Sequence, residues 1–524
     1  MATDFQSLGV RTRSAHPPSA PGALTSYWNS SAELLPFPSV NGDLAVDVAI
    51  VGGGLCGLTS ALLLARAGKS VAVVEARRLG RQATGHTTAK ITSQHAIIYA
   101  DLEKRFGEEG ARIYGEAQQA ALEWMATQVR EMRIDCDFVR KPAYVYAESE
   151  KAGAIVEQEA EVARKIGLPA SLTHTLDLPY PVRCAVRFDN QAQFHPIRYL
   201  RSVISELQDR GCRLFEDSRV LDVEDGEPCA LTLDRGRIRA AEVIVATNMP
   251  MLDRGGYFAK AAPYRHMVLG ARLAHSAADL SGMYLGVDPP IRSVRTTPTL
   301  EGPLLIVVGE PFKPGAANTT ELAAELEDWI RVRFAVQAIE YRWGNQDYFP
   351  VDRVPYVGKM TSSTKHIGVA TGFQAWGMTN STVAAMILSD EILGRHNPWA
   401  ETFHATRKPG VVGTLKLLND NLQVAGHFAK DHTFGNSRTG IEDLRPGEGG
   451  IVKRGGKEVA AYREPTGTLH VVSPVCRHLG CHVRWNAAEL SWDCPCHGSR
   501  YDVRGSVLNG PTVKCLSGLA DGES

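Results

Sequence analysis

The sequence predicts an α/β domain that contains an inserted α+β portion and is followed by a small all-β domain. Three observations lead to this fold class. A strand–helix–strand pattern occupies residues 47–74, helical and extended patterns alternate up to residue 246, and short strand-like runs with frequent turns follow residue 435. A chain of 524 residues also exceeds what one hydrophobic core normally supports, so we expect more than one domain.

Composition and charge exclude several classes of protein. Hydrophobic residues make up 44% of the chain and charged residues 22%, which is typical of globular proteins and excludes a wholly disordered chain. Lys and Arg total 57 against 58 Asp and Glu, so the chain has no general electrostatic attraction to nucleic acid or anionic lipid. We therefore expect no nucleic-acid partner.

No segment of the sequence has the pattern of a secretory signal or a membrane span. The first 28 residues are polar and lack a basic end followed by an apolar core. The longest apolar stretch, residues 46–65, is interrupted by glycines and fits a strand, a turn and a helix better than a spanning helix. We expect a soluble, cytoplasmic protein without a transmembrane segment.

The N-terminal pattern fits one βαβ unit. Residues 47–51 are apolar and β-branched, as expected of a buried parallel strand. Leucine and alanine then recur at helical spacing over residues 58–65, Gly68 suits the end of that helix, and residues 71–74 form a second apolar run. This order predicts two parallel strands joined by a crossover helix.

Further elements follow along the chain. Apolar residues at spacings of three and four predict helices over residues 101–132, 196–210, 320–335 and 378–394. Extended patterns predict strands over residues 213–223, 230–234, 240–246 and 469–472, while residues 259–355 are mixed.

These patterns give the predicted domain division. It consists of an N-terminal extension (residues 1–40), the α/β domain with its insertion (41–398), a linker (399–435) with a helical stretch at 413–430, and the small domain (436–524). The boundary after residue 398 lies where prolines and glycines become frequent, because these residues interrupt regular elements.

The residues between the first strand and the first helix carry a dinucleotide-binding signature. Residues 52–57 read Gly-Gly-Gly-Leu-Cys-Gly and fit G-x-G-x-x-G. Gly52 permits the tight turn, Gly54 lets the backbone approach a pyrophosphate, and Gly57 lets helix and strand pack closely. Glu75 ends the second strand and can accept hydrogen bonds from ribose hydroxyls. A glycine-rich turn without a ligand is the alternative.

Three stretches resemble the glycine/D-amino-acid oxidase (DAO) superfamily of FAD-dependent oxidoreductases. Residues 47–76 resemble its FAD-binding start, residues 368–378 its second flavin segment, and residues 350–358 the approach to that segment. The resemblance covers residues 40–395, with a loosely matched middle. It implies a Rossmann-like FAD-binding domain, an inserted α+β substrate domain, and oxidation of a C–N bond in an amine or amino acid.

The resemblance also implies which residues contact FAD. Residues 84–90 are expected to pass beneath the flavin, where His86 could carry the flavin covalently, although we favour a non-covalent contact. The full set of expected FAD-binding residues is Gly52, Gly54, Leu55, Cys56, Gly57, Glu75, Ala76, His86, Thr87, Thr88, Val220, Gly372, Gly377 and Met378.

Cysteine and histidine gather near the C-terminus. Cys476 and His478 form a C-x-H pair, and Cys494 and His497 form a C-x-x-H pair. This pattern closely resembles a Rieske domain, which implies that the two cysteines hold one iron of a [2Fe–2S] cluster and the two histidines hold the other. A structural zinc site is the alternative, although zinc fingers usually place both histidines on one helix.

Four neighbouring residues match the respiratory type of Rieske protein. In the proteins that this segment resembles, the positions of Cys481 and Cys496 form a disulfide that joins the cluster loops; two free thiols are the alternative. Ser499 and Tyr501 match hydroxyls that donate to cluster sulfurs. This match predicts a potential in the upper half of the Rieske range of roughly −150 to +300 mV.

Two redox centres in one chain suggest a relay. A flavin takes two electrons at once from an organic substrate, and a Rieske cluster passes single electrons to an external acceptor, a protein or a quinone. The sequence shows one G-x-G-x-x-G, which favours direct substrate oxidation. The arrangement, including residues 84–99, resembles a bacterial group of fused proteins. An NAD(P)H-driven reductase, a Rieske oxygenase and a non-catalytic carrier or sensor are the alternatives.

No acid or base of the reaction is identified from the sequence. His95, His195, Tyr264, Arg265 and Tyr348 are candidates because they lie in family-like or polar–aromatic segments. Arg265 could pair with a substrate carboxylate. For each of the five, packing or a surface position is the alternative.

Overall fold

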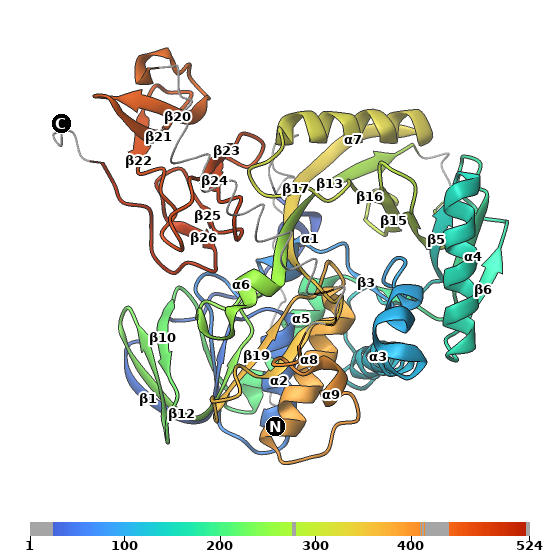
Figure 1. Ribbon diagram of the computed structural model, residues 1–524, viewed down its shortest axis with the longest axis horizontal. Helices are drawn as coiled ribbons and strands as arrows, with labels where there is room; N and C mark the ends of the chain where they lie inside the picture. The colour runs from blue at the N-terminus through green and yellow to red at the C-terminus, as the bar shows by residue number, and fades with distance from the viewer. Residues whose placement is uncertain (1–24, 275–278, 409, 411–412, 414–439, 520–524) are drawn as a thin grey trace, which may run out of the picture.

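The computed structural model describes residues 25–274, 279–408, 410, 413 and 440–519 (Figure 1). The helical stretch predicted at 413–430, and most of the predicted linker, lie outside these ranges apart from single residues after 408. Residues 25–408 are called the large domain below, and residues 440–519 the small domain.

The first sheet of the large domain contains the predicted βαβ unit. β1 (Gly42–Val51) lies between β12 (Gly236–Val245) and β2 (Val71–Val74), and the three strands run parallel. α2 (Leu55–Arg66) connects β1 to β2. The strand, helix and strand predicted around the glycine-rich segment are therefore confirmed.

Five further strands complete this sheet. The order is β10-β11-β12-β1-β2-β9, and β19 pairs with both β12 and β18. The single extended run predicted at 213–223 is two strands, because Asp217 adopts a left-handed conformation (φ 46°) between them. The bounds are β9 (Arg213–Phe215), β10 (Val220–Glu224), β11 (Cys229–Leu233), β18 (Tyr356–Lys359) and β19 (Ile367–Thr371).

A second eight-stranded sheet forms the insertion, in the order β17-β13-β16-β15-β14-β5-β7-β6. Its longest strands, β13 (Ala261–Leu273) and β17 (Val336–Pro350), pair antiparallel and form a ribbon whose one end lies beside the small domain (Figure 1). The other strands are β5 (Ala143–Ala147), β6 (Ala170–Thr173), β7 (Cys184–Phe188), β14 (Met283–Gly286), β15 (Ser293–Thr297) and β16 (Leu304–Val308). A small third sheet joins β3 (Lys90–Ile91), β8 (Ala192–Gln193) and β4 (Val139–Arg140).

The four predicted helices are confirmed as α3 (Tyr99–Glu131), α5 (Pro196–Asp209), α7 (Thr319–Arg333) and α8 (Gly377–Ile392). α3 is kinked at Gly107, whose φ of 74° is not helical. The other described helical segments are α1 (Tyr27–Ser31), α4 (Glu150–Lys165), α6 (Tyr257–Lys260), α9 (Ala400–Phe403), η1 (Ala83–His86), η2 (Arg254–Gly256) and η3 (Ile441–Asp443). Among the described helices, none combines the length and apolarity needed to cross a bilayer.

Residues 25–40, which the sequence analysis set apart as an extension, pack against the large domain. Trp28 of α1 is completely buried, and its indole N–H donates to the carbonyl oxygen of Thr87 at 2.6 Å. This short helix therefore supports the segment that contains η1.

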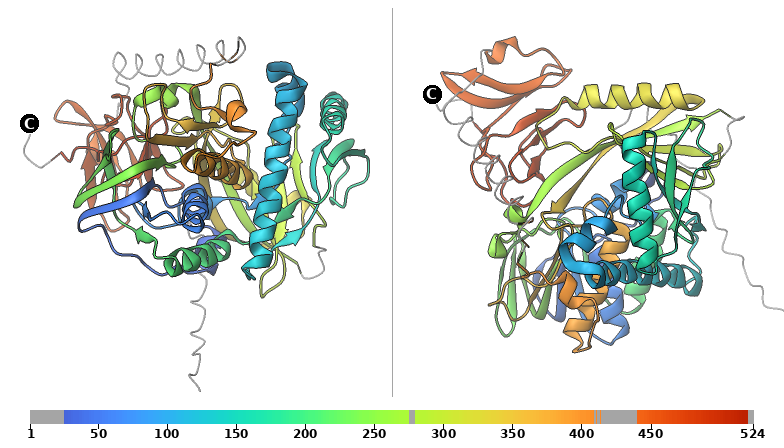
Figure 2. Two further views of the ribbon diagram at one scale, coloured as in Figure 1. Left: turned by 90° about the horizontal axis from the view of Figure 1, so that it is seen from below. Right: turned by 45° about the vertical axis from the view of Figure 1, so that its right-hand side comes forward.

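The small domain is all-β, as predicted. β20 (Gly449–Arg454), β21 (Lys457–Arg463) and β22 (Leu469–Val472) form one antiparallel sheet, and β22 has the predicted bounds. β23 (Arg484–Asn486), β24 (Ser491–Asp493), β25 (Arg500–Tyr501) and β26 (Val507–Asn509) form a second. The domain lies at one end of the molecule, against the ribbon of β13 and β17 and against α6 (Figures 1 and 2).

Candidate functional site

A cavity lies at the carboxyl ends of β1 and β2, where most of the predicted FAD-binding residues converge. Its lining includes Gly52, Gly54, Leu55, Cys56, Glu75, Ala76, Thr87, Val220, Gly377 and Met378 from the predicted set. Gly57, His86, Thr88 and Gly372 are not part of its lining. The small domain also contributes, through Leu508, Asn509, Gly510, Thr512 and Val513.

Two glycines shape the turn between β1 and α2. Gly52 has a φ of 111°, and a Cβ there would lie 2.4 Å from the carbonyl oxygen of Ala246. A Cβ on Gly57 would lie 2.0 Å from the carbonyl oxygen of Gly52, so this glycine permits close packing of helix on strand. The N-cap residue Gly54 has no side chain to cap α2, and Leu55 follows it in the cavity wall. Backbone N–H groups and a helix dipole at this position fit the pyrophosphate of FAD.

The Glu75 carboxylate is anchored by the backbone. Its Oε2 accepts from the N–H of Gly53 and its Oε1 from the N–H of Arg77, each at 2.9 Å. Burial raises the pKa of Glu75 above its usual value, and the two hydrogen bonds oppose that effect. Each carboxylate oxygen retains a lone pair, so Glu75 fits a contact to ribose hydroxyls.

The segment around η1 lies between this cavity and a second, polar one. His86 lines the second cavity together with Arg77, Arg78, Arg81, Gln82, Trp343, Gly344, Glu489, Arg500, Leu508 and Asn509. Its Nδ1 lies 2.8 Å from the carbonyl oxygen of Gln82, and burial lowers the pKa of the ring, which favours neutral imidazole. The carbonyl oxygen of Thr88 accepts from Arg295 at 2.6 Å. Covalent attachment of flavin to His86 stays a prediction.

The predicted second flavin segment forms a tight turn before α8. Gly372 has a φ of 80°, and a Cβ there would lie 2.6 Å from Cγ of Pro350. Gln374 and Ala375 follow with φ values of 44° and 67°. Gly377 and Met378 then begin α8 and line the cavity, so the turn brings the helix N-terminus to the expected flavin site.

Asp347 is a cavity residue that was missed from the sequence. Its carboxylate is 7% exposed and accepts from the N–H groups of Tyr348 and Ala375, each at 2.8 Å. Burial raises the pKa of Asp347 to about 6, and no cationic side chain of the described residues contributes to its shift. The only sequence signal was an aspartate within the polar–aromatic segment around Tyr348.

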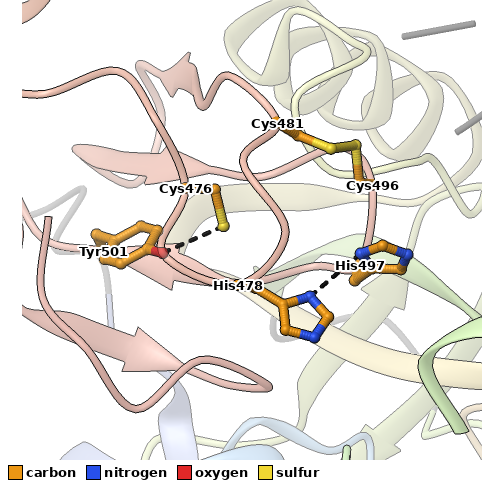
Figure 3. Close-up of a disulfide and its surroundings, with 6 residues drawn as sticks. All are labelled: Cys476, His478, Cys481, Cys496, His497 and Tyr501. Carbon is orange, nitrogen blue, oxygen red and sulfur yellow. Dashed lines mark hydrogen bonds between the residues drawn. A yellow bond between two sulfur atoms is a disulfide. The ribbon is translucent and has the colours of Figure 1, made fainter. Parts of the chain in front are cut away.

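Two loops of the small domain carry the four predicted cluster ligands, of which Figure 3 shows Cys476, His478 and His497. The first loop, between β22 and β23, carries Cys476 and His478, and the second, between β24 and β25, carries Cys494 and His497. The two histidine rings lie perpendicular to each other, with their Nδ1 atoms 3.2 Å apart. Cys476 and Cys494 are hydrogen-bonded to each other and buried. Each loop thus offers one sulfur and one imidazole, the donor set of a Rieske cluster.

The pKa shifts suit metal binding at Cys476 and His497, whereas the hydrogen bond with Cys476, together with burial, raises the pKa of Cys494 well above its usual value, so Cys494 must lose its proton when metal binds. A hydrogen bond with Cys494 lowers the pKa of Cys476 to about 6, with a further contribution from the Tyr501 hydroxyl. Burial, together with the neighbouring His478, lowers the pKa of His497 to about 4. Thiolate sulfur and neutral imidazole are the forms that bind metal.

The predicted disulfide is present between Cys481 and Cys496 and joins the two loops (Figure 3). The sulfurs of Cys481, Cys494 and Cys496 lie within 4.8 Å of one another. Because Cys481 and Cys496 are bonded to each other, Cys494 is the member of this group with a thiol available to metal.

The two hydroxyl residues occupy different positions around the ligands. Tyr501 Oη lies 3.2 Å from the sulfur of Cys476 (Figure 3). The same oxygen accepts from the N–H of Arg477 at 3.1 Å. Ser499 is completely buried, and its Oγ accepts from the N–H of Thr512 at 3.3 Å. The contact of Tyr501 with a ligand sulfur supports its predicted role, whereas that of Ser499 stays a prediction.

The two histidine candidates for catalysis lie outside the cavity lining. His95 is fully buried, with Nδ1 2.7 Å from the Tyr114 hydroxyl and its ring stacked on Trp376. His195 caps α5, and its Nε2 lies 3.0 Å from the Ser31 hydroxyl. Burial lowers the pKa of each histidine to about 3, which favours neutral imidazole, and a catalytic role for either residue stays a prediction.

The remaining three candidates lie on the β13–β17 ribbon. Tyr264 packs edge-on against Phe349, with ring centroids 5.1 Å apart. Arg265 is completely buried and donates to Glu489 of the small domain. Tyr348 is 2% exposed, and its hydroxyl contacts the small domain as well. Arg265 therefore faces another part of this protein at the place where a substrate carboxylate was expected.

The small-domain residues in the cavity wall were also missed. Leu508 and Asn509 carry no motif, and a sequence does not show which face of one domain meets another. Thr84 was part of a recognised segment but was not singled out; its hydroxyl accepts from the N–H of Leu55 at 3.0 Å. A small hydroxyl residue in the segment beneath the flavin was the available signal.

Comparison with known proteins agrees with both halves of the structure. Residues 47–391 match the family described as FAD dependent oxidoreductase, and residues 439–520 match the Rieske [2Fe-2S] domain. The putative Rieske 2Fe-2S iron-sulfur protein YhfW of Bacillus subtilis strain 168 is 36% identical over 94% of this chain and 96% of its own length.

Two further relatives match the large domain. The gamma-glutamylputrescine oxidoreductase of Escherichia coli K12 is 28% identical over 44% of this chain and 55% of its own length. The crystal structure of glycine oxidase from Geobacillus kaustophilus superposes with a TM-score of 0.58 at 19% identity, covering 70% of this chain and all of that one, which shows the shared fold. The chain belongs to the FAD-dependent oxidoreductase family of DAO type and carries a C-terminal Rieske domain, so its cofactors are FAD and a [2Fe–2S] cluster.

Proposed function

We propose that this enzyme oxidises the C–N bond of a small amine or amino acid and passes the electrons singly through the Rieske cluster to an external acceptor, a protein or a quinone. The observation that carries this proposal is the shared cavity wall. Leu508, Asn509 and Gly510 of the Rieske domain line the same cavity as the predicted FAD-binding residues. This arrangement supports electron transfer within one chain.

The overall reaction balances with a one-electron acceptor alone. The amine loses two electrons and two protons and becomes an imine, which water converts to a carbonyl compound with release of ammonia or, from a substituted amine, the smaller amine. Two acceptor molecules take one electron each, and both protons pass to the solvent. When bound, FAD accepts the electron pair as hydride, and the cluster handles one electron at a time.

The charges along the cavity favour an amine over an amino acid. Asp347 presents a buried carboxylate that can bind a protonated amine through a charge-assisted hydrogen bond. Arg265, the residue considered for a substrate carboxylate, is held by Glu489 and Asp493. Three arginines also line the cavity, namely Arg77, Arg78 and Arg219. Arg77 and Arg219 lie near the Glu75 carboxylate, and Arg78 follows it closely in the chain, so all three belong to the expected ribose end of the cavity. A relative named for a putrescine derivative is consistent with this choice.

The test is an anaerobic titration of the purified holoenzyme with monoamines, diamines, amino acids and NADH. We expect an amine to bleach the flavin absorbance and then to produce the rhombic EPR signal of a reduced histidine-ligated cluster, with an average g near ~1.9. Reduction by NADH alone would establish the reductase alternative. Reduction by dithionite alone would favour the carrier or sensor. The cytoplasmic location expected from the sequence stays a prediction.

A further inference from the structure

The cluster histidines are covered by the flavin domain. The side chain of His478 is 5% exposed, and its Nε2 donates to Asp253 at 2.8 Å. The ring of Phe258 lies edge-on to both cluster histidines, with centroids 5.1 Å from His478 and 5.0 Å from His497. An external acceptor therefore has no direct access to this edge while the domains are docked.

Tyr348 connects the second cluster loop with the flavin cavity. Its hydroxyl lies 3.3 Å from the carbonyl oxygen of His497 and 3.2 Å from that of Gly510. Gly510 lines the cavity, and so does Asp347, the preceding residue on β17. The Tyr348 side chain thus contacts both a cluster-ligand residue and a cavity-wall residue.

The contact around Tyr348 is close-packed. The side-chain N–H of Gln346 donates to the carbonyl oxygen of Gly498 at 2.7 Å and to the Tyr348 hydroxyl at 3.0 Å. A Cβ on Gly498 would lie 2.6 Å from Nε2 of Gln346 and 2.7 Å from Cβ of Pro263. The glycine that follows His497 therefore allows the second loop to approach the β13–β17 ribbon.

A buried group of four charges lies next to the same loop, whose two ends are flanked by Asp493 and Arg500. Arg265 of the flavin domain donates to Glu489 and lies 3.8 Å from Asp493. Arg500 pairs with both acids, at 2.8 Å to Asp493 and 3.3 Å to Glu489. Asp493 immediately precedes the ligand Cys494. Two arginines balance two carboxylates, and the Rieske domain alone would leave its two acids with one arginine.

We infer that Arg265 and Tyr348 are positioning residues that dock the Rieske domain with its histidine edge against the flavin domain. In this position the histidine edge receives single electrons from reduced flavin, and the external acceptor takes them from another surface of the cluster domain. The inference rests on the proposed relay for its direction. It also assigns Arg265 to the domain interface in place of substrate recognition.

The test compares two conservative variants with matched controls. Tyr348→Phe removes one hydroxyl, and Arg265→Lys keeps the charge but loses the forked geometry. The controls are Tyr356→Phe, whose buried hydroxyl has no hydrogen-bond partner in the described part of the chain, and Arg272→Lys, which changes the β13 arginine that pairs with Glu340. All four variants are assayed as full-length holoenzyme.

The first readout is amide hydrogen exchange, which does not depend on turnover. Protection of residues 494–512 should fall by about fivefold in Tyr348→Phe, as expected from the loss of one hydrogen bond, and by more in Arg265→Lys. The two controls should retain wild-type protection in this segment. Unchanged protection in both interface variants would overturn the assignment.

The second readout is electron transfer after photochemical reduction of the flavin, which needs no substrate. We expect the cluster absorbance to bleach more slowly in both interface variants, while dithionite still produces the full EPR signal. If no amine reduces the flavin but this photochemical transfer still depends on Tyr348, the docking inference stands and the proposed substrate class fails. Equal transfer rates in wild type and both variants would contradict the inference itself.

Discussion

The FAD cavity takes its lining from segments between Val51 and Val513, whereas the cluster ligands all lie between Cys476 and His497. The cavity is shaped mainly by backbone turns, glycines and the junction of two domains. The cluster site is made by side chains on two loops that a disulfide joins. The cluster site therefore corresponds to a compact sequence motif, whereas the residues of the FAD cavity are spread over distant segments of the sequence.

The prediction with the largest expected effect tests whether the cluster site can be lost without affecting the FAD site. Cys494→Ser should abolish the Rieske EPR signal, because one iron loses a thiolate ligand, while FAD absorbance stays at the wild-type level. Cys515→Ser, an exposed cysteine of the same domain, is the control and should keep the full signal. Loss of FAD from Cys494→Ser would show that the two sites do not fill independently.

The converse variant disturbs the cavity and leaves the cluster loops intact. Gly57→Ala should destabilise the large domain by about 3 kcal/mol or more and weaken FAD binding, because the new Cβ meets the Gly52 carbonyl oxygen at 2.0 Å. Gly153→Ala in α4 is the control, since its Cβ would meet the flexible Arg183 side chain at 3.3 Å. Thermal unfolding and flavin release measure both, and a wild-type melting temperature in Gly57→Ala would count against the close helix–strand contact.

Asp347 provides a pH-dependent test of the cavity. Burial raises the pKa of Asp347 from 3.8 to about 6, so the folded state favours the protonated form. The stabilisation is complete at low pH and is lost as the pH rises through 6. The stability of the wild type should therefore fall relative to Asp347→Asn by about 3 kcal/mol between pH 3 and pH 7. Denaturant unfolding across this range measures the difference, and a pH-independent difference would place the carboxylate in contact with water.

The smallest expected effect concerns the surroundings of the cluster. Tyr501→Phe removes a hydroxyl 3.2 Å from the sulfur of Cys476 and should lower the cluster potential by about 40 mV, the equivalent of one hydrogen bond. Ser499→Ala should have a smaller effect, because the Ser499 hydroxyl accepts from the N–H of Thr512 and, within the described part of the chain, contacts no ligand sulfur. Tyr462→Phe, which changes a ring stacked on Trp485, is the control. A redox titration followed by EPR ranks the three, and an unchanged potential in Tyr501→Phe would remove Tyr501 from the cluster's hydrogen-bond donors.

The same contrast explains how much could be predicted from the sequence. The βαβ unit, the four long helices and the cluster ligands follow from local spacing, because periodicity and ligand motifs are properties of neighbouring residues. Gly52 and Gly57 were predicted for reasons that the structure bears out, namely a positive φ and close packing. Strand propensity did not predict the break at Asp217, where one residue in a left-handed conformation divides the predicted strand in two.

Other parts of the site could not be predicted, because they depend on contacts between distant segments. Arg265 was considered for a substrate carboxylate, since a sequence does not reveal that Glu489, more than two hundred residues away, occupies its guanidinium. Asp347 gained its raised pKa from burial that only the assembled cavity creates. The contribution of Leu508 to Gly510 to the cavity wall depends on the docking of two domains, for which the sequence holds no local signal.

The buried group of Arg265, Glu489, Asp493 and Arg500 has a consequence for how this enzyme behaves on dilution. Both sides of the contact belong to one chain, so the association is intramolecular and its effective concentration is set by the tether and not by the amount of protein. Separate flavin and iron–sulfur proteins would part in dilute solution and exchange partners. A fused pair keeps a fixed ratio of one flavin to one cluster, so in the proposed relay both electrons of one substrate molecule would pass through the same cluster in turn.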